Sequence, residues 1–288
     1  MPNTSRPQTP ANAEQITYWN DVGGPKWVRY QAMLDRQLEA IGNRAITASK
    51  IHAGANVLDV GCGCGSTTLE IARRVGISGR CVGLDISRPM LEVAQERARD
   101  GVVGNASFVE ADAQVHQFDP DFHIVFSRFG VMFFDDPVAA FTNLRRALQP
   151  GGRLAFVCWQ ALHRNPWMSV PMMAAFQHVK IEPPASQDAP GPFAFADVAR
   201  VEGILASAGF HAAALTGVDV ELAIGGGADI DDTVAFLMDM GPLGRALAGE
   251  SADIRAAVTR DVKSSIASYT TGGGVRMSGA VWIVTASV

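Results

Sequence analysis

The sequence predicts an α/β fold in which helices cover both faces of a doubly wound, mostly parallel sheet. Three observations support this prediction. From residue 51 onward, short apolar runs alternate with segments of helical periodicity, which is typical of strand–helix–strand units. The chain contains 29 glycines, which indicates many tight turns. Apolar residues make up 48% of the 288 residues and charged residues only 18%, which is enough for a large core.

A helical segment precedes the alternating region. Its pattern begins at Glu14, is interrupted at Gly23, Gly24 and Pro25, and resumes from Trp27 to about Lys50. Residues 1–13 are polar and we expect them to form a frayed tail. They lack the apolar run of a signal peptide, and no stretch of about 18 apolar residues follows that could span a membrane. We therefore expect a cytoplasmic protein with reduced thiols.

The central region predicts five buried strands in succession. We expect them at residues 56–60, 80–85, 106–110, 123–127 and 153–159. Helices are expected at residues 66–75, 88–99 and 137–148, the second with Ser87 as its N-cap and Pro89 in its first turn. The run Pro150-Gly151-Gly152 is expected to end the third helix.

After Trp159 the alternation of apolar runs with helical segments is less regular, but it still predicts individual elements. Helices are expected at residues 165–179, 196–208, 230–247 and 252–268, with a proline-rich loop after the first of them. Strands are expected at residues 210–224 and 280–286, which brings the sheet to seven strands. No internal repeat interrupts this order.

The clearest chemical signal is the run Leu58-Asp59-Val60-Gly61-Cys62-Gly63-Cys64-Gly65 at a strand-to-helix turn. Glycines at such a turn let a ligand rest against main-chain N–H groups at the start of the helix. A dinucleotide fingerprint would need a third glycine at position 66, which is Ser66 here. Asp59 lies inside the apolar strand, where a buried carboxylate needs a partner such as the ammonium group of a bound amino acid.

With these residues the chain resembles the class I S-adenosylmethionine (SAM) dependent methyltransferases, in the small-molecule branch that includes the ubiquinone/menaquinone C-methyltransferases. The resemblance runs from about Ile51 to Trp159. It rests on four segments in the same order: VLDVGCGCG at 57–65, VGLDIS at 82–87, EADA at 110–113 and LQPGGRL at 148–154. It implies a Rossmann-like core at residues 51–160, a tail and helical lid at residues 1–50, and acceptor-site insertions with the last strands at residues 161–288.

The resemblance also implies how SAM would be held. Asp59 and the loop of Gly61, Cys62, Gly63 and Gly65 would hold its methionine part, with the two loop cysteines acting through their backbone. Asp85 would accept hydrogen bonds from the ribose hydroxyls, and Ile86 would pack on the adenine. Asp85 has another interpretation, as a residue that ends a strand and caps the next turn.

Further along the chain the same family pattern places four more residues. Asp112 would receive the adenine amino group, with Ala113 beside it supplying a backbone contact, although Asp112 could equally be a surface turn residue. Ser127 and Arg128 would line the methyl-donor end, and an arginine at a strand end is also often solvated or ion-paired. These residues all follow the carboxyl ends of strands, where open α/β sheets bind ligands.

Two further candidates lie outside the core. Trp19, next to Tyr18 and Asn20, would close over the sulfonium in a lid, or alternatively would only fix the N-terminal helix to the sheet. His163, after the fifth strand, is a candidate general base, with Arg128 as a second catalytic candidate; a loop histidine is otherwise simply solvated.

The sequence favours a small organic acceptor whose carbon, oxygen or nitrogen is methylated. A net charge of −5 gives no field that would favour nucleic acid, and no membrane insertion or metal site is expected. The oligomeric state is open. Two rival functions remain: an NAD(P)-dependent oxidoreductase, and a non-catalytic SAM-binding scaffold.

Overall fold

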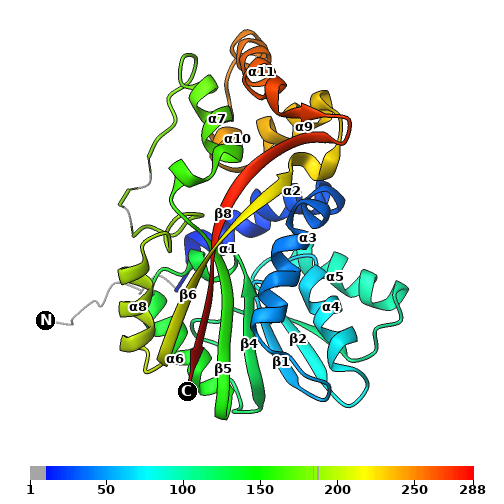
Figure 1. Ribbon diagram of the computed structural model, residues 1–288, viewed down its shortest axis with the longest axis vertical. Helices are drawn as coiled ribbons and strands as arrows, with labels where there is room; N and C mark the ends of the chain where they lie inside the picture. The colour runs from blue at the N-terminus through cyan, green and yellow to red at the C-terminus, as the bar shows by residue number, and fades with distance from the viewer. Residues whose placement is uncertain (1–10, 184, 187) are drawn as a thin grey trace, which may run out of the picture.

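The computed structural model describes residues 11–183, 185–186 and 188–288, and one sheet organises them (Figure 1). The strand order is β3-β2-β1-β4-β5-β8-β6, and a short β7 pairs with β8. The first five strands run parallel, whereas β8 is antiparallel to β5 and β6. The predicted α/β class and the mostly parallel seven-stranded sheet are confirmed, with β7 as an additional two-residue strand. The strands are β1 (Asn56–Val60), β2 (Arg80–Asp85), β3 (Ala106–Glu110), β4 (Phe122–Arg128), β5 (Leu148–Trp159), β6 (His211–Ala223), β7 (Thr270–Thr271) and β8 (Gly274–Ser287).

Helices cover both faces of the sheet. In Figure 1, α3, α4 and α5 lie on one side of the strands and α6 and α8 on the other. The central strands are buried on both faces, which requires mostly apolar sequences such as those of β1 and β4. The helices are α1 (Ala13–Asp21), α2 (Gly23–Arg29), α3 (Gln31–Ala48), α4 (Ser66–Val75), α5 (Arg88–Asp100), α6 (Pro137–Ala147), α7 (Pro166–Ala175), α8 (Val198–Ser207), α9 (Ile230–Asp239), α10 (Gly241–Ala246) and α11 (Ala252–Ile266).

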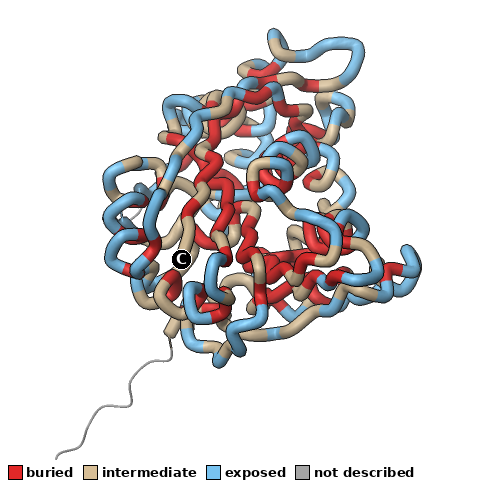
Figure 2. The backbone as a smooth tube through the Cα atoms, turned by 60° about the horizontal axis from the view of Figure 1, so that its bottom comes forward, coloured by how far each residue is buried: buried red, intermediate tan, exposed pale blue. Residues whose placement is uncertain are grey.

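A group of helices stands beyond the carboxyl ends of the parallel strands. α7, α9, α10 and α11 pack on one another there, and the long strands β6 and β8 extend from the sheet up to them (Figure 1). Figure 2 shows buried backbone running through the strands into this group, with exposed segments around the outside. The chain order reverses between β1 and β4, so a ligand crevice is expected at the carboxyl ends of these two strands.

The N-terminal helices break at a different place from the one expected. Gly23, Gly24 and Pro25 form the first turn of α2, and the breaks fall at Val22 and Tyr30. The glycines serve close packing, because a Cβ on Gly24 would meet the Trp19 carbonyl oxygen at 2.1 Å. Residues 1–10 of the expected tail lie outside the described residues, and its last residue, Ala13, already belongs to α1.

Other boundaries were also predicted wrongly. β5 begins at Leu148 instead of residue 153, so Pro150-Gly151-Gly152, which was expected to end the third helix, lies inside this strand. The single helix expected at 230–247 is split into α9 and α10, because Met240 is extended and Gly241, at a φ of 61°, precedes Pro242. The strand expected at 280–286 is twice as long, since β8 begins at Gly274 and pairs with β6 as far as Arg276. The Gly241-Pro242 pair is a local signal that the helical periodicity masked, whereas tertiary pairing with β6 sets the start of β8.

Candidate functional site

A cavity of about 260 Å³ lies at the carboxyl ends of the parallel strands, where the crevice was expected. Its wall falls into two parts. The polar side comes from the ends of β1 to β4 and includes Gly61, Gly63, Asp85, Asp112 and Arg128. The aromatic side comes mainly from the end of β5 and from α7, α9 and α10. It includes Trp159, Trp167, Met168, Met172, Phe236 and Leu243.

The glycine loop between β1 and α4 forms one edge of the polar side. Gly61, Gly63 and Gly65 have φ values of 66°, 54° and 79°, a region that favours glycine. A Cβ on Gly61 would lie 2.6 Å from the Cα of Gly130, which follows β4. The two loops that flank the point of reversal therefore touch backbone to backbone, and position 61 has no room for a side chain.

Asp85 holds the glycine loop from the end of β2. Its buried carboxylate accepts hydrogen bonds from the Gly63 N–H at 2.8 Å and from the Ser87 N–H at 2.9 Å. Burial raises the pKa of Asp85, while these backbone donors oppose the rise. A carboxylate has about four lone-pair positions, so Asp85 keeps acceptor capacity toward the cavity that it lines.

Asp59 lies behind the loop and does not line the cavity. Its Oδ2 accepts hydrogen bonds from the hydroxyls of Thr67 and Thr68, both at 2.7 Å. Its Oδ1 is buried and has no hydrogen-bond partner among the described residues. Burial raises the pKa of Asp59 to about 6. An unpaired buried carboxylate oxygen is costly and is a place where a donor from a ligand or water would be stabilising.

Arg128 ends β4 and lines the cavity next to an ion pair that the sequence did not indicate. Burial lowers the pKa of Arg128, and the carboxylates of Asp35 and Asp59 oppose this. Asp35, on α3, pairs with Arg97 of α5 at 2.7 Å, and Arg97 also donates to the Cys64 carbonyl at 2.6 Å. Within the described chain the Arg128 guanidinium forms no ion pair, so its charge is available to an anion in the cavity.

Asp112, Ala113 and Ile86 also line the cavity, and Asp112 is engaged by the N-terminal segment. The side-chain amide of Asn12 donates to both carboxylate oxygens of Asp112 at 2.9 Å. Asn12 also exchanges hydrogen bonds with Asp135, donating its N–H and accepting with its Oδ1. No local pattern distinguishes Asn12, and its contacts reach more than 100 residues along the chain.

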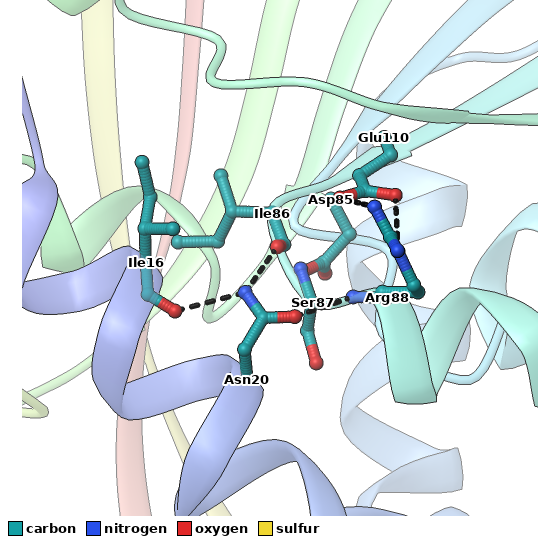
Figure 3. Close-up of polar contacts among 7 residues, drawn as sticks. All are labelled: Ile16, Asn20, Asp85, Ile86, Ser87, Arg88 and Glu110. Carbon is teal, nitrogen blue, oxygen red and sulfur yellow. Dashed lines mark hydrogen bonds and ion pairs between the residues drawn. The ribbon is translucent and has the colours of Figure 1, made fainter.

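Helix α1 is fastened to the carboxyl end of β2 (Figure 3). The Asn20 side chain donates to the Ile86 carbonyl at 2.8 Å and accepts from the Arg88 N–H at 3.0 Å. Ser87 occupies the N-cap position of α5 as predicted, but its hydroxyl donates to the Trp19 carbonyl at 2.7 Å, and the Asn20 side chain accepts from the first N–H of the helix instead. The Trp19 ring lines the cavity and packs edge-on against Trp27 and Phe133.

Besides Asp59, three predicted site residues lie outside the cavity wall. Ser127 donates its hydroxyl to the Val60 carbonyl at 2.8 Å and accepts from Gly130, so it ties β4 to β1. Gly65 packs under the loop, where a Cβ would meet Ala94 at 2.9 Å. His163 is exposed in a short 3-10 turn. None of the three is placed to contact a ligand directly through a side chain.

The aromatic side carries little acid–base chemistry. Trp159 stacks on Phe129 with ring centroids 4.3 Å apart and lies 5.0 Å from Trp167. No histidine and no glutamate is among the described residues that line the cavity. Burial raises the pKa of both loop cysteines, that of Cys64 to about 12, so the thiols are protonated at neutral pH. The sequence analysis did not predict Trp159 or Trp167 as site residues.

The described residues contain neither a metal-binding cluster nor a membrane-spanning helix. Among the residues described, no group of three or more His, Cys, Asp or Glu side chains could hold a metal ion. Over the same part of the chain, every helix is too short or too polar to cross a membrane.

The residues around this site are similar to those of known methyltransferases. A family described as "methyltransferase domain" matches residues 57–152, which contain the glycine loop, Asp85, Asp112 and Arg128. The ubiquinone/menaquinone biosynthesis C-methyltransferase of Idiomarina loihiensis is 38% identical over 111 residues, which is 38% of this chain and 44% of that protein. The match therefore spans less than half the length of that relative.

Solved structures resemble the chain more broadly but at lower identity. A putative methyltransferase from Bacillus halodurans has a TM-score of 0.56 at 17% identity and covers 85% of this chain and 97% of its own. The [4+2]-cyclase SpnF has a TM-score of 0.51 at 18% identity and covers 86% and 80%. At this identity the likeness shows the fold alone. Residues 57–152 thus match a methyltransferase domain, and these solved structures share the fold over most of the chain.

Proposed function

We propose that this protein is an enzyme that transfers the methyl group of SAM to a small organic acceptor by in-line displacement. The observation that carries the proposal is the clamp between Asp85 and the Gly63 N–H, at the edge of a cavity and inside the methyltransferase domain. This hydrogen bond holds the glycine loop against the end of β2, and the loop has no room for a side chain at position 61. Such a backbone cradle next to a buried carboxylate suits a nucleoside with an attached polar chain.

The residues on the polar side fit each part of SAM. Asp85 has free acceptor capacity for the ribose hydroxyls, and Ile86 packs beside it for the adenine. Asp112 offers its carboxylate to the adenine amino group once Asn12 releases it. When bound, the cofactor supplies a methyl group activated by a positively charged sulfur.

The zwitterionic end of SAM matches the charges beyond the glycine loop. We assign Arg128 to the α-carboxylate, because its guanidinium is unpaired within the described chain and lines the cavity. This differs from a catalytic role. For the ammonium group of SAM, the cavity wall offers the Asp35 carboxylate. The Oδ1 atom of Asp59, which has no hydrogen-bond partner among the described residues, lies behind the glycine loop.

On the acceptor side, the protein contributes alignment and the exclusion of water. Residues 161–288 supply α7, α9 and α10 to the aromatic side, which supports their assignment as the acceptor part of the site. Helices α1 and α2 act as the lid, with Trp19 facing the cavity. The described lining has neither histidine nor glutamate, and its carboxylates at Asp35, Asp85 and Asp112 are engaged by Arg97, Gly63 and Asn12. We therefore favour an acceptor nucleophile that needs no side-chain base, such as a neutral amine or an ionised oxygen or carbon.

The rival functions have weaker support. A nicotinamide site leaves Asp59 and Arg128 without a role, and the family match gives it no support. A SAM-binding scaffold would keep the same polar side, and only turnover distinguishes it. The negative net charge favours a small molecule over nucleic acid, and four free cysteines fit a cytoplasmic protein.

The first experiment is a calorimetric titration of S-adenosylhomocysteine, with NAD as the control ligand. We expect micromolar binding of S-adenosylhomocysteine and no signal with NAD. Asp85→Ala should abolish the binding, whereas Asp121→Ala, which removes a half-exposed carboxylate next to Arg80, should leave it unchanged. Binding of NAD, or no binding of S-adenosylhomocysteine to the wild-type protein, would overturn the proposal. Incubation of the loaded protein with cell extract then tests whether the methyl group is consumed.

A further inference from the structure

The solvent-exposed edge of the cavity at α2 and α10, here called its mouth, carries an excess of positive charge. Lys26 of α2 and the exposed Arg245 of α10 line the cavity, and Arg29 shares a carboxylate with Lys26. The Asp239 carboxylate at the end of α9 pairs with Lys26 at 3.0 Å and with Arg29 at 3.6 Å. The Asp239 carboxylate thus pairs with two of the three cations, and the third cation does not pair with it.

Arg245 is that third cation. Its guanidinium carbon lies 5.7 Å from the centre of the Tyr18 ring and the side chain is exposed. Among the described residues it has no ion-pair or hydrogen-bond partner, although it lines the cavity. A guanidinium that rests on an aromatic face keeps its N–H groups in one plane and available to a carboxylate, sulfonate or phosphate.

The aromatic side of the same cavity is apolar. Phe129 stacks on Trp159, Trp167 is tilted by 48° against Trp159, and Met168 and Met172 of α7 also line the cavity. Such a cluster suits a flat ring system, because aromatic and methionine side chains pack against ring faces and edges. An anionic group would lose its hydration there without a partner, so it would remain at the mouth.

We propose that the acceptor is a flat, apolar molecule that carries an anionic group, with the rings against Trp159 and Trp167 and the anion at Arg245. This inference rests on the proposed function, since it concerns the acceptor of the same site. It also gives the acceptor one orientation. The anion at the mouth fixes one end, so the opposite edge of the ring system points along the aromatic side toward the polar side.

The test uses two fluorescent probes that differ only in a sulfonate. 8-Anilino-1-naphthalenesulfonate carries the anion, and N-phenyl-1-naphthylamine is the same ring system without it. We expect both to bind the wild-type protein at one site. Arg245→Gln should weaken the sulfonate probe about fivefold and leave the neutral probe within about twofold, the size of one partly exposed charge pair.

Three variants control this comparison. Arg245→Lys keeps the charge and should restore most of the affinity for the sulfonate probe. Arg260→Gln removes an equal charge from α11, outside the cavity wall, and should change neither probe. Trp167→Ala should weaken both probes, which places them in the cavity.

The outcomes separate this inference from the proposed function. Equal effects of Arg245→Gln on the two probes, or no effect on either, would overturn the anionic acceptor. Titration of S-adenosylhomocysteine into Arg245→Gln should match the wild-type protein, because Arg245 lies at the mouth. If S-adenosylhomocysteine binds and the probe pattern fails, only the acceptor class is wrong. If S-adenosylhomocysteine does not bind the wild-type protein, the methyltransferase proposal fails and takes this inference with it.

Discussion

The polar and aromatic sides of the cavity are built in different ways. The polar side comes from short turns after consecutive strands, and much of it is backbone: the Gly63 N–H meets Asp85, and Gly61 meets Gly130. The aromatic side comes from side chains on elements far apart in sequence, such as Trp159 on β5 and Phe236 on α9. The first depends on chain geometry and tolerates little change. The second depends on side-chain packing and can be altered while the fold persists.

Gly61→Ala is the variant that we expect to damage the polar side of the cavity most. The added methyl group would overlap the Cα of Gly130, and the φ of 66° is strained for alanine, so we expect a loss of roughly 3 kcal/mol or more in unfolding free energy. Binding of S-adenosylhomocysteine should fall below detection. Gly249→Ala is the control, since its φ is also positive, at 86°, and a Cβ there would meet nothing within 4 Å. Urea unfolding should give only about 1 kcal/mol for the control. Equal losses in the two variants would show that the contact with Gly130 does not matter.

Asp59 gives the next largest effect, as a dependence on pH. The pKa of Asp59 is about 6 in the folded protein, against an ordinary value of 3.8 for an exposed aspartate. Between these two pH values the folded protein therefore binds more protons than the unfolded chain. Wild-type stability should therefore fall as pH rises from 4 to 7, by about 3 kcal/mol from this group. Asp59→Asn does not titrate, so its unfolding free energy should improve relative to wild type by that amount over the same range. Asp121→Asn, at an exposed ion pair, serves as control. Parallel curves for Asp59→Asn and wild type would contradict the prediction.

Arg128 tests which part of the ligand the polar side recognises. Arg128→Gln should weaken S-adenosylhomocysteine by about 10- to 100-fold, the range for a charge-assisted hydrogen bond in a partly buried site. 5′-Methylthioadenosine lacks the amino-acid end, so its affinity should change by less than about twofold. Calorimetry on both ligands decides the assignment. If both ligands weaken equally, Arg128 supports the site as a whole and does not bind the carboxylate.

The smallest effect concerns the link between the N-terminal helices and the helices that carry the aromatic side. Asp239→Asn removes the ion pairs to Lys26 and Arg29, which are partly exposed, so we expect a change of only about two- to fivefold in S-adenosylhomocysteine affinity. Hydrogen exchange of residues 13–29 should speed up in this variant. Asp231→Asn, on the same helix and paired with exposed Lys263, is the control. Unchanged exchange in Asp239→Asn would show that this pair does not hold the helices.

The sequence was a good guide wherever local signals set the structure. β1, β2, β3 and α4 have the predicted bounds, because glycine and proline turns bracket short apolar runs there. The same segments carry Gly61, Asp85 and Asp112 to the cavity. Arg97 and Asn12 could not be found this way, since their partners lie 62 and 100 residues away. That His163 is exposed and outside the cavity wall could not be foreseen either, because a position after a strand does not tell whether the side chain faces a cavity or solvent.

The attachments of α1 and α2 have a consequence for turnover. Asn20 joins this segment to the end of β2, and Lys26 joins it to Asp239 beside the aromatic side. The segment of α1 and α2 therefore covers both the polar and the aromatic side of the cavity, and one opening movement would expose both sides together. Spent cofactor and methylated product would then leave through the same gate, and the residence time of one would limit the exchange of the other.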